Sequence, residues 1–441
     1  MRVDHSAMAR RAKAVSTRAL EPFEIGNKKE FITVDRSALK DILNQPSASD
    51  YKNIQNHIKK IEERLGVSLG EKGEDNHIRY TLHELYLILD GMSQLEPKPK
   101  YFNSIPQALR FKEAFVLAIS NLKGGTGKSS TVIHLAIALA LANYRRPRIL
   151  IIDADPQGQV YLSMDGRAID FNEQPSVGSV CMKIPPKVKP SDMSQRDWLK
   201  RDVILPSHVE NIDFIAGQPD DQGIQDFFSK DFKRGKSDEW DAYRALNKEI
   251  IEPLKGDYDI IIIDLPPSNT KHVASAIYAA DGVLKPVAVR PMDTHSTLSY
   301  MSILSDWMSD FEDFLSDEYK PAKFLKVLPL ADEGTNVSNS QIRKLKQAYT
   351  PEHVLQPIPF ARAYGVANAD NNKTLFDYEN QSAFIGVRHE WKQGIEAWSM
   401  TADRVLSFIE DAHLDEEDLA FDHKAMADMA QQELCNTKDR G

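Results

Sequence analysis

One glycine-rich segment constrains the fold of this chain more strongly than any other. Residues Ala114–Ser130 read AFVLAISNLKGGTGKSS, and the first six of them are apolar and fit a buried strand. The loop Gly124–Ser129 follows, and the run Thr131–Asn143 has the spacing of a helix. Strand, glycine-rich loop and helix in this order are typical of a P-loop, in which backbone N–H groups and the helix N-terminus bind phosphate. A turn that only joins a strand to a helix is disfavoured, because the whole structural context of the motif is present.

This loop carries the groups that bind a nucleoside triphosphate. Lys128 is expected to hold the β- and γ-phosphates, and the Ser129 hydroxyl is expected to ligate Mg²⁺. We therefore predict ATP and Mg²⁺ as the cofactors of the site. The loop residues expected to contact the nucleotide are Lys123, Gly124, Gly125, Thr126, Gly127, Lys128, Ser129 and Ser130.

Two further apolar runs end in carboxylates. Residues 148–153 and 258–264 are almost continuously apolar, as parallel strands with helices on both faces must be. Carboxylates at the C-terminal ends of such strands face the ligand crevice. Asp264 is therefore expected to bind the Mg²⁺ shell through water, and Asp153 and Asp155 are expected to face the same site. Acids that only close a strand into a turn are the alternative, which the P-loop upstream disfavours.

The rest of the chain after residue 106 alternates between predicted strands and helices. Apolar runs at 211–216, 282–289, 323–330 and 354–359 predict further strands, and residues 340–349 predict a basic helix. This alternation predicts an α/β P-loop NTPase domain over residues 107–410, with a mostly parallel sheet flanked by helices. A proline-containing linker, residues 95–106, is expected to precede it.

Residues 31–94 predict a small, separate α-helical domain with a winged helix-turn-helix. Helices are expected at 37–43 and from about residue 49 to 65, with a turn at 44–47 and a wing at 70–80. A capping box from Thr81 to Glu84 is expected to open a third helix. A docking or dimerisation module with a merely solvated polar face is the alternative, because helix-turn-helix signals are weak on their own. The second helix carries side chains suited to bases and phosphates on its outer face: Lys52, Asn53, Gln55, Asn56 and Lys59.

The segment 121–125, Asn-Leu-Lys-Gly-Gly, resembles the deviant Walker A motif of the ParA/MinD superfamily, and within it the ParA branch. It departs from the strict P-loop pattern, which has glycine in place of Leu122. The resemblance implies that Lys123 reaches across an ATP-bound homodimer to the partner's nucleotide. Residues 153–157, Asp-Ala-Asp-Pro-Gln, are similar to the first switch of these proteins, which implies that Asp155 positions the attacking water and Asp153 supports the Mg²⁺ side. The expected catalytic residues are Lys123, Lys128 and Asp155.

The layout of the chain resembles a long-form ParA, in which an N-terminal helix-turn-helix binds an operator and represses the partition operon. The resemblance implies partition of a plasmid or chromosome, with weak intrinsic ATP hydrolysis that a ParB-like centromere-binding partner stimulates. It also implies a base pocket after the last strands, with Pro359, Phe360, Ala361 and Arg362 as candidates. C-terminal basic residues are implied to bind DNA of any sequence, and the candidates are Arg343, Lys344, Lys346, Arg362 and Lys373.

Charge and composition limit the remaining alternatives. A net charge of −10 argues against wholesale coating of nucleic acid, and no apolar stretch approaches the roughly 18 residues of a membrane span. Residues 1–30 are expected to form a basic helix or arm, and residues 411–441 an acidic tail that anionic lipid would repel. We expect a cytoplasmic, nucleoid-associated protein with no membrane partner. Two alternatives stay open: a transcriptional regulator that only senses nucleotide, and a MinD-like membrane-positioning ATPase.

Overall fold

The computed structural model describes residues 32–43, 48–73, 76–165, 169–170, 172–184, 187–224, 226–227, 240–370, 372–378, 383–414 and 422–438. The predicted basic arm (residues 1–30) and the predicted turn at 44–47 lie outside these residues. The chain divides into two compact units, unit 1 within Met1–Gln107 and unit 2 within Ala108–Asp165 and Ile169–Gly441. Each unit is described by itself.

Unit 1 combines helices with a small antiparallel sheet in the order β1-β3-β2. Successive turns of α3 bury Ile54, Ile58 and Ile61 against α4. Gly91 of α4 allows close approach, because a Cβ there would lie 2.8 Å from Ile61. The predicted capping box at Thr81 is present: the Glu84 N–H donates to Thr81 Oγ1 over 3.2 Å. The elements are β1 (Thr33–Asp35), η1 (Arg36–Ala38), α2 (Leu39–Ile42), α3 (Ala48–Leu65), β2 (Glu71–Lys72), β3 (Ile78–Thr81), α4 (Leu82–Ser93) and η2 (Phe102–Ser104).

Unit 2 is built on a seven-stranded sheet in the order β10-β9-β4-β8-β5-β7-β6. Every pairing in this sheet is parallel except that of β6 with β7, so the predicted mostly parallel sheet is confirmed. The elements in chain order are β4 (Phe115–Ile119), α5 (Lys128–Leu141), η3 (Ala142–Tyr144), β5 (Ile149–Asp153), α6 (Val160–Met164), α7 (Val177–Met182), α8 (Gln195–Trp198), η4 (Leu199–Val203), β6 (Leu205–Pro206), β7 (Ile212–Ile215), η5 (Pro219–Gly223), α10 (Asp241–Leu246), η6 (Asn247–Ile251), α11 (Glu252–Leu254), β8 (Ile260–Asp264), α12 (Lys271–Ala279), β9 (Gly282–Ala288), α13 (Pro291–Phe314), β10 (Phe324–Leu330), α14 (Asn336–Tyr349), η7 (Pro351–His353), α15 (Ala363–Ala369), η8 (Leu375–Asp377), α16 (Arg388–Leu414) and α17 (His423–Lys438).

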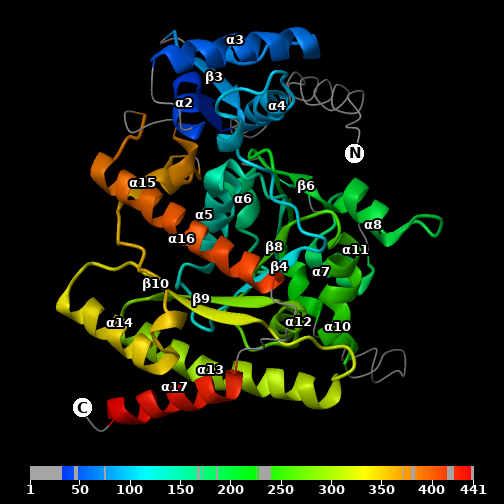
Figure 1. Ribbon diagram of the computed structural model, residues 1–441. Helices are drawn as coiled ribbons and strands as arrows, with labels where there is room; N and C mark the ends of the chain where they lie inside the picture. The colour runs from blue at the N-terminus through cyan, green and yellow to red at the C-terminus, as the bar shows by residue number, and fades with distance from the viewer. Residues whose placement is uncertain are drawn as a thin grey trace. The chain divides into compact units, whose positions relative to one another are not determined.

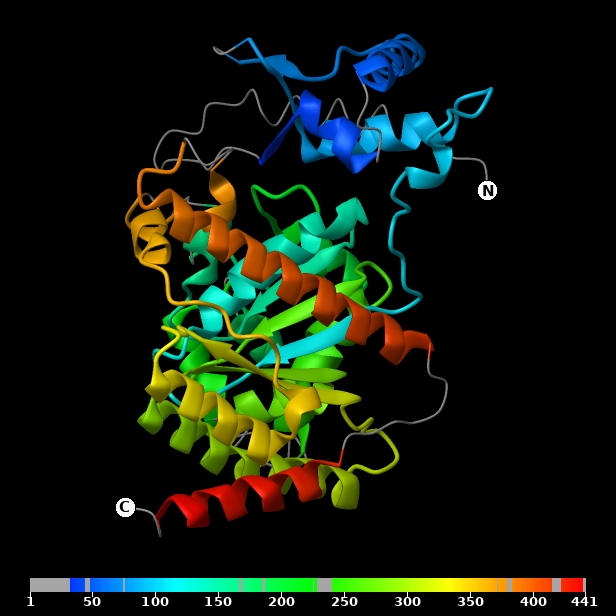
Figure 2. The same cartoon turned by 60° about the vertical axis from the view of Figure 1, so that its left-hand side comes forward.

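Helices cover both faces of this sheet, which explains why its central strands β4, β5 and β8 are buried at every position. Side chains of alternate residues, such as Val116 and Ala118 in β4, join a core cluster with Ile277 of α12 and Leu304 of α13. The opposite face packs on α5, and α16 lies over α5 as an outer layer. Figures 1 and 2 show the sheet between these two sets of helices. A parallel sheet must be shielded in this way, and the arrangement leaves its carboxyl edge open for a ligand.

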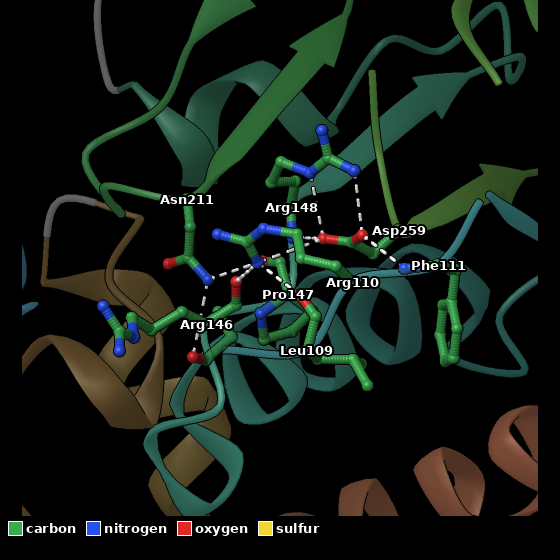
Figure 3. A network of polar contacts seen from close by, with 9 residues as sticks. Leu109, Arg110, Phe111, Arg146, Pro147, Arg148, Asn211 and Asp259 are labelled. Carbon is green, nitrogen blue, oxygen red and sulfur yellow. Dashed lines mark hydrogen bonds and ion pairs between the residues drawn. The ribbon is translucent and has the colours of Figure 1, made fainter. Parts of the chain in front are cut away.

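A buried polar network anchors the amino edge of the sheet (Figure 3). Asp259, just before β8, is fully buried and accepts three hydrogen bonds from Arg148, just before β5, through its backbone N–H and its guanidinium, over 2.7 to 3.0 Å. Asp259 also accepts from the Phe111 N–H over 3.0 Å and from Arg110 over 3.4 Å. The Phe111 ring stacks on His413 of α16, with centroids 3.8 Å apart. The segment that enters unit 2 is thus fixed between the strand ends and the last turn of α16.

Two segments differ from the sequence prediction. Residues 354–359 form no strand; only isolated bridges join Val354 to Val327 and Pro359 to Asp332. Pro357 and Pro359 have no N–H to donate to a ladder, which explains the interruption.

The predicted acidic tail is partly folded. The end of α16 continues through Leu414, and α17 packs against α13 and α14. Met426, Ala430 and Leu434 form one buried stripe of α17 within the core cluster, so this part of the segment belongs to unit 2. The most acidic part, residues 415–421, lies outside the described residues.

Candidate functional site

The P-loop sits where the sequence placed it, between β4 and α5. Gly125 and Gly127 have φ of +73° and +81°, a backbone conformation that favours glycine. A Cβ on Gly127 would lie 2.9 Å from the end of the Leu330 side chain, which would have to shift. Gly127 caps α5 without any side-chain hydrogen bond, and the N-terminal N–H groups of a fourteen-residue helix therefore face the loop without a capping side chain. Such an end favours an anion, above all phosphate.

Lys128 points back into the loop that precedes it. Its side chain is buried, and its Nζ donates to the Lys123 carbonyl oxygen over 3.3 Å. Burial lowers the pKa of Lys128, while the carboxylates of Asp264 and Asp155 oppose this effect. The lysine thus lies within electrostatic reach of both predicted acids, as a residue that holds phosphates beside a metal site should.

Asp153 and Asp264 end neighbouring strands and are paired directly in register. Both are fully buried, and desolvation raises the pKa of each carboxyl, with the charge of Asp264 adding to the effect on Asp153. The Asp153 oxygens accept from the N–H groups of Asp155 and Val160 over 3.3 and 3.1 Å. Weak hydrogen bonds from Ser129 and from the Leu265 backbone reach Asp264, but among the described residues neither of its oxygens has a hydrogen-bond partner of ordinary geometry. A buried carboxylate in this state needs a cation or a water, and a Mg²⁺ ion with its water shell fits that need.

Asp155 occupies the turn after β5. Its Oδ1 accepts from the Gln157 N–H over 2.9 Å, which holds the carboxylate at the start of the turn. His272, in the first turn of α12, holds the same turn from the other side, because its Nε2 lies 3.1 Å from the Ala154 carbonyl oxygen. Burial lowers the pKa of His272 to about 4, so the neutral ring donates this hydrogen bond at neutral pH. Sequence reasoning did not identify this histidine, which lies on α12, the helix that follows the other acidic strand, β8.

Lys123 forms an ion pair within its own chain. Its Nζ contacts a carboxylate oxygen of Asp293, in the first turn of α13, whose side chain is 7% exposed against 35% for that of Lys123. Thr297 on the same helix donates to the Asp293 carbonyl oxygen over 2.9 Å and accepts from Asn121 over 2.8 Å. The segment before the P-loop and the start of α13 are therefore held together. Sequence reasoning missed Asp293, because it is far from Lys123 in the chain.

A cavity of about 510 Å³ runs from the P-loop to the C-terminal part of unit 2. The predicted base-pocket residues line it together, namely Pro359, Phe360, Ala361 and Arg362, and so do Gly125, Thr126, Gly127 and Ser130 of the loop. Tyr364 of α15 and Trp398 of α16 also line it, and sequence reasoning did not identify either of them. The cavity has the size and the mostly apolar walls of a small-molecule site.

The structure divides the predicted DNA-binding residues of unit 2 into two sets. Arg343 and Lys346 are exposed on α14 and Lys344 is half-buried there. Arg362 lines the cavity instead, and Lys373 pairs with Asp370 over 2.9 Å. Their closeness in sequence therefore does not produce one basic patch, since α14 packs against α13 and α17 (Figure 1).

The predicted recognition face in unit 1 lies on one helix. Lys52, Asn53, Asn56 and Lys59 are exposed on α3, and Gln55 is half-buried. The opposite side of α3 carries its buried isoleucines, so the polar side chains share the solvent face.

Comparisons with known proteins identify sequences and a structure that are similar to this chain. A family model described as an AAA domain matches residues 114–304. Plasmid partition protein A of Escherichia coli is 25% identical over 273 residues, which cover 60% of this chain and 62% of that protein. The chromosome partitioning protein ParA of Myxococcus xanthus is 25% identical over 244 residues, which cover 55% of this chain and 74% of that protein.

A solved structure described as a partition protein shares the fold. It aligns with a TM-score of 0.60 at 18% identity and covers 92% of this chain and 97% of its own. No helix among the described residues has the length and the apolar character needed to cross a membrane. The chain is therefore similar in sequence to ParA-type partition proteins and shares the fold of a solved partition protein.

Proposed function

We infer that this protein is an ATP-dependent partition ATPase, which segregates a plasmid or a chromosome. One observation carries the proposal: Lys128 of the P-loop interacts electrostatically with the buried carboxylates of Asp264 and Asp155. These groups lie at the carboxyl edge of the sheet, where β5 and β8 end side by side. Partition proteins among its relatives support the same cellular role. This chain covers 62% of the length of the Escherichia coli relative. The activity and the partners of the whole protein are therefore part of the proposal.

The side chains of the site have distinct roles in this proposal. Lys128 and the N–H groups at the start of α5 bind the phosphates, and Ser129 and Asp264 hold the Mg²⁺ ion, with Asp153 in support. Bound Mg²⁺ supplies charge neutralisation between phosphate oxygens. Asp155 orients the water that attacks, and His272 keeps the turn of Asp155 in place. Catalysis here depends on positioning and electrostatics, which is consistent with slow turnover in the absence of a partner.

The ATP-bound form is proposed to be a homodimer that grips DNA of any sequence. Lys123 would exchange Asp293 for the nucleotide of the partner subunit, and the exposed Arg343 and Lys346 of α14 would contact phosphates. A ParB-like partner would stimulate hydrolysis and release the dimer. The exposed face of α3 in unit 1 would bind an operator and repress the partition operon.

One set of measurements tests both activities. We would measure binding of random DNA and of DNA from upstream of the partition operon, with no nucleotide, with ADP and with a slow ATP analogue. ATP analogue should promote a dimer and binding of random DNA, while operator binding should depend on the sequence of the DNA. Lys128→Ala should lose nucleotide binding and every ATP-dependent step, and the exposed Lys112→Ala should behave as wild type.

Three outcomes would contradict the proposal. A protein that binds no nucleotide, or that stays monomeric and indifferent to DNA with the analogue and Mg²⁺, is not this kind of ATPase. Nucleotide binding without turnover, even with DNA and a ParB-like partner, would favour a nucleotide-sensing regulator. Sedimentation with anionic liposomes only in the presence of ATP would favour a MinD-like positioning ATPase.

A further inference from the structure

The cavity beside the P-loop ends on two polar groups that have no role in the proposed function. Trp398 is 2% exposed, and a weak hydrogen bond joins it to Tyr364. Among the described residues neither its indole N–H nor the Tyr364 hydroxyl has a hydrogen-bond partner of ordinary geometry. Burial raises the pKa of Tyr364 to about 12, so its hydroxyl keeps its proton and can donate. Buried polar groups in native proteins are nearly always paired, so such groups at the wall of a cavity indicate a ligand that pairs with them.

The walls around these groups are flat and apolar. Leu330, Ile358, Pro359 and Phe360 line the cavity between the P-loop and Trp398. Such walls accept the faces of a planar heteroaromatic ring, and the two polar groups would meet its edge. Two exposed arginines, Arg290 and Arg362, also line the cavity.

One residue of α5 connects this end of the cavity with the P-loop. The His134 ring stacks on Trp398, with centroids 5.5 Å apart and planes at 21°, and meets Tyr364 edge-on at 5.4 Å. Its Nδ1 lies 2.8 Å from the Ser130 carbonyl oxygen and 3.3 Å from the Ser130 hydroxyl. Ser130 itself lines the cavity two residues after Lys128. The aromatic side chains are therefore packed against the start of the helix that binds the phosphates.

We propose that Trp398 and Tyr364 determine which nucleobase the site accepts, by hydrogen bonding to the edge of a purine whose phosphates lie in the P-loop. The proposal rests on the nucleotide site proposed above and adds a specificity element from α15 and α16, which follow the last strand of the sheet. A base that presents the wrong donors and acceptors leaves these two buried groups with no partner except each other, which should weaken its binding about tenfold or more.

The test uses the full chain and three probes that do not require hydrolysis: ADP, inosine diphosphate and inorganic tripolyphosphate. Inosine diphosphate exchanges donor and acceptor positions at the base edge, and tripolyphosphate has no base. Wild type should prefer ADP over inosine diphosphate by about tenfold or more. Trp398→Phe and Tyr364→Phe should each reduce that preference about threefold to tenfold and leave tripolyphosphate affinity unchanged. The control Trp307→Phe, on α13, should keep the wild-type preference.

Trp398 also provides a spectroscopic readout. ADP should change the indole fluorescence of wild type and of Trp307→Phe but not of Trp398→Phe, and tripolyphosphate should leave all three unchanged. Variants that retain the wild-type preference and the wild-type fluorescence change would overturn the proposal. Wild type that binds neither ADP nor tripolyphosphate would refute the nucleotide site itself. If Trp398→Phe fails to fold, Tyr364→Phe, which removes only one oxygen, tests the proposal through the same comparison of ADP, inosine diphosphate and tripolyphosphate affinities.

Discussion

The buried carboxylate of Asp259 offers the sharpest test of how unit 2 is held together, and Asp259→Ala is the perturbation. The substitution removes the acceptor of two backbone N–H groups, those of Phe111 and Arg148, and the ion-pair partner of the Arg148 guanidinium. The carboxylate is fully buried, so water cannot replace it at the same place without rearrangement.

The expected loss of stability follows from these contacts. Two backbone N–H groups left without an acceptor cost about 1 kcal/mol each, and the charged contacts of Arg148 contribute about 2 kcal/mol together. The Arg148 side chain is 36% exposed and partly regains water, so we expect a total of about 3–4 kcal/mol. This value agrees with the roughly 3–5 kcal/mol measured when one partner of a buried ion pair is removed.

Urea unfolding followed by circular dichroism measures this loss directly. Arg110→Ala is the matched control, because Arg110 meets the same carboxylate at 3.4 Å and is 48% exposed, so its removal should cost less than about 1 kcal/mol. Nucleotide affinity should not change in either variant, since the network lies at the amino edge of the sheet and the P-loop at the carboxyl edge. A loss below 1 kcal/mol for Asp259→Ala, or equal losses for both variants, would refute the reasoning.

The remaining predictions concern a buried lysine, the P-loop and DNA. Burial lowers the pKa of Lys285 to about 7, so between pH 7 and 9 the unfolded chain binds more protons than the folded one and wild-type stability should rise with pH. Lys285→Met should flatten that rise in urea titrations and be neutral or stabilising at pH 7. Lys123→Ala should keep its affinity for ADP within about threefold of wild type, measured by calorimetry. The same variant should form no dimer with a slow ATP analogue in size-exclusion chromatography, whereas Asp293→Asn should promote that dimer. Arg343→Ala and Lys346→Ala should each weaken binding of random DNA and reduce the slope of log affinity against log salt by about 1, measured by fluorescence anisotropy; unchanged slopes would exclude α14 from the DNA contact.

The sequence predicts the part of the site that short stretches of chain build alone. The P-loop is one segment, and its glycines and lysine need only the strand and the helix on either side. Asp153 and Asp264 are predictable because parallel strands end at the same edge, so that two carboxylates distant in sequence lie side by side. The fold class follows from the same apolar runs, which had to be strands covered on both faces.

The rest of the site depends on packing that no local pattern encodes. Trp398 lines the cavity because α16 crosses α5, and a tryptophan in an amphipathic helix gives no sign of which element it will meet. His272 is similarly placed by the packing of α12. The sequence carried a signal for α17 in the spacing of Met426, Ala430 and Leu434, but the acidic composition of the segment obscured it.

The ion pair between Lys123 and Asp293 explains why Asp293→Asn should promote the ATP-bound dimer. On the side of Lys123 the contact is easily broken, because a lysine that is 35% exposed regains water when it leaves. Its departure costs more, since it leaves a carboxylate that is only 7% exposed without its cation. That cost opposes any dimer in which Lys123 moves to the partner's nucleotide, and Asp293→Asn removes it while keeping the shape of the side chain. The variant should therefore dimerise at lower concentrations of the ATP analogue than wild type. Asp306→Asn, exposed on the same helix, should not. Weaker dimerisation of Asp293→Asn would mean that the carboxylate acts within the dimer and does not compete with it.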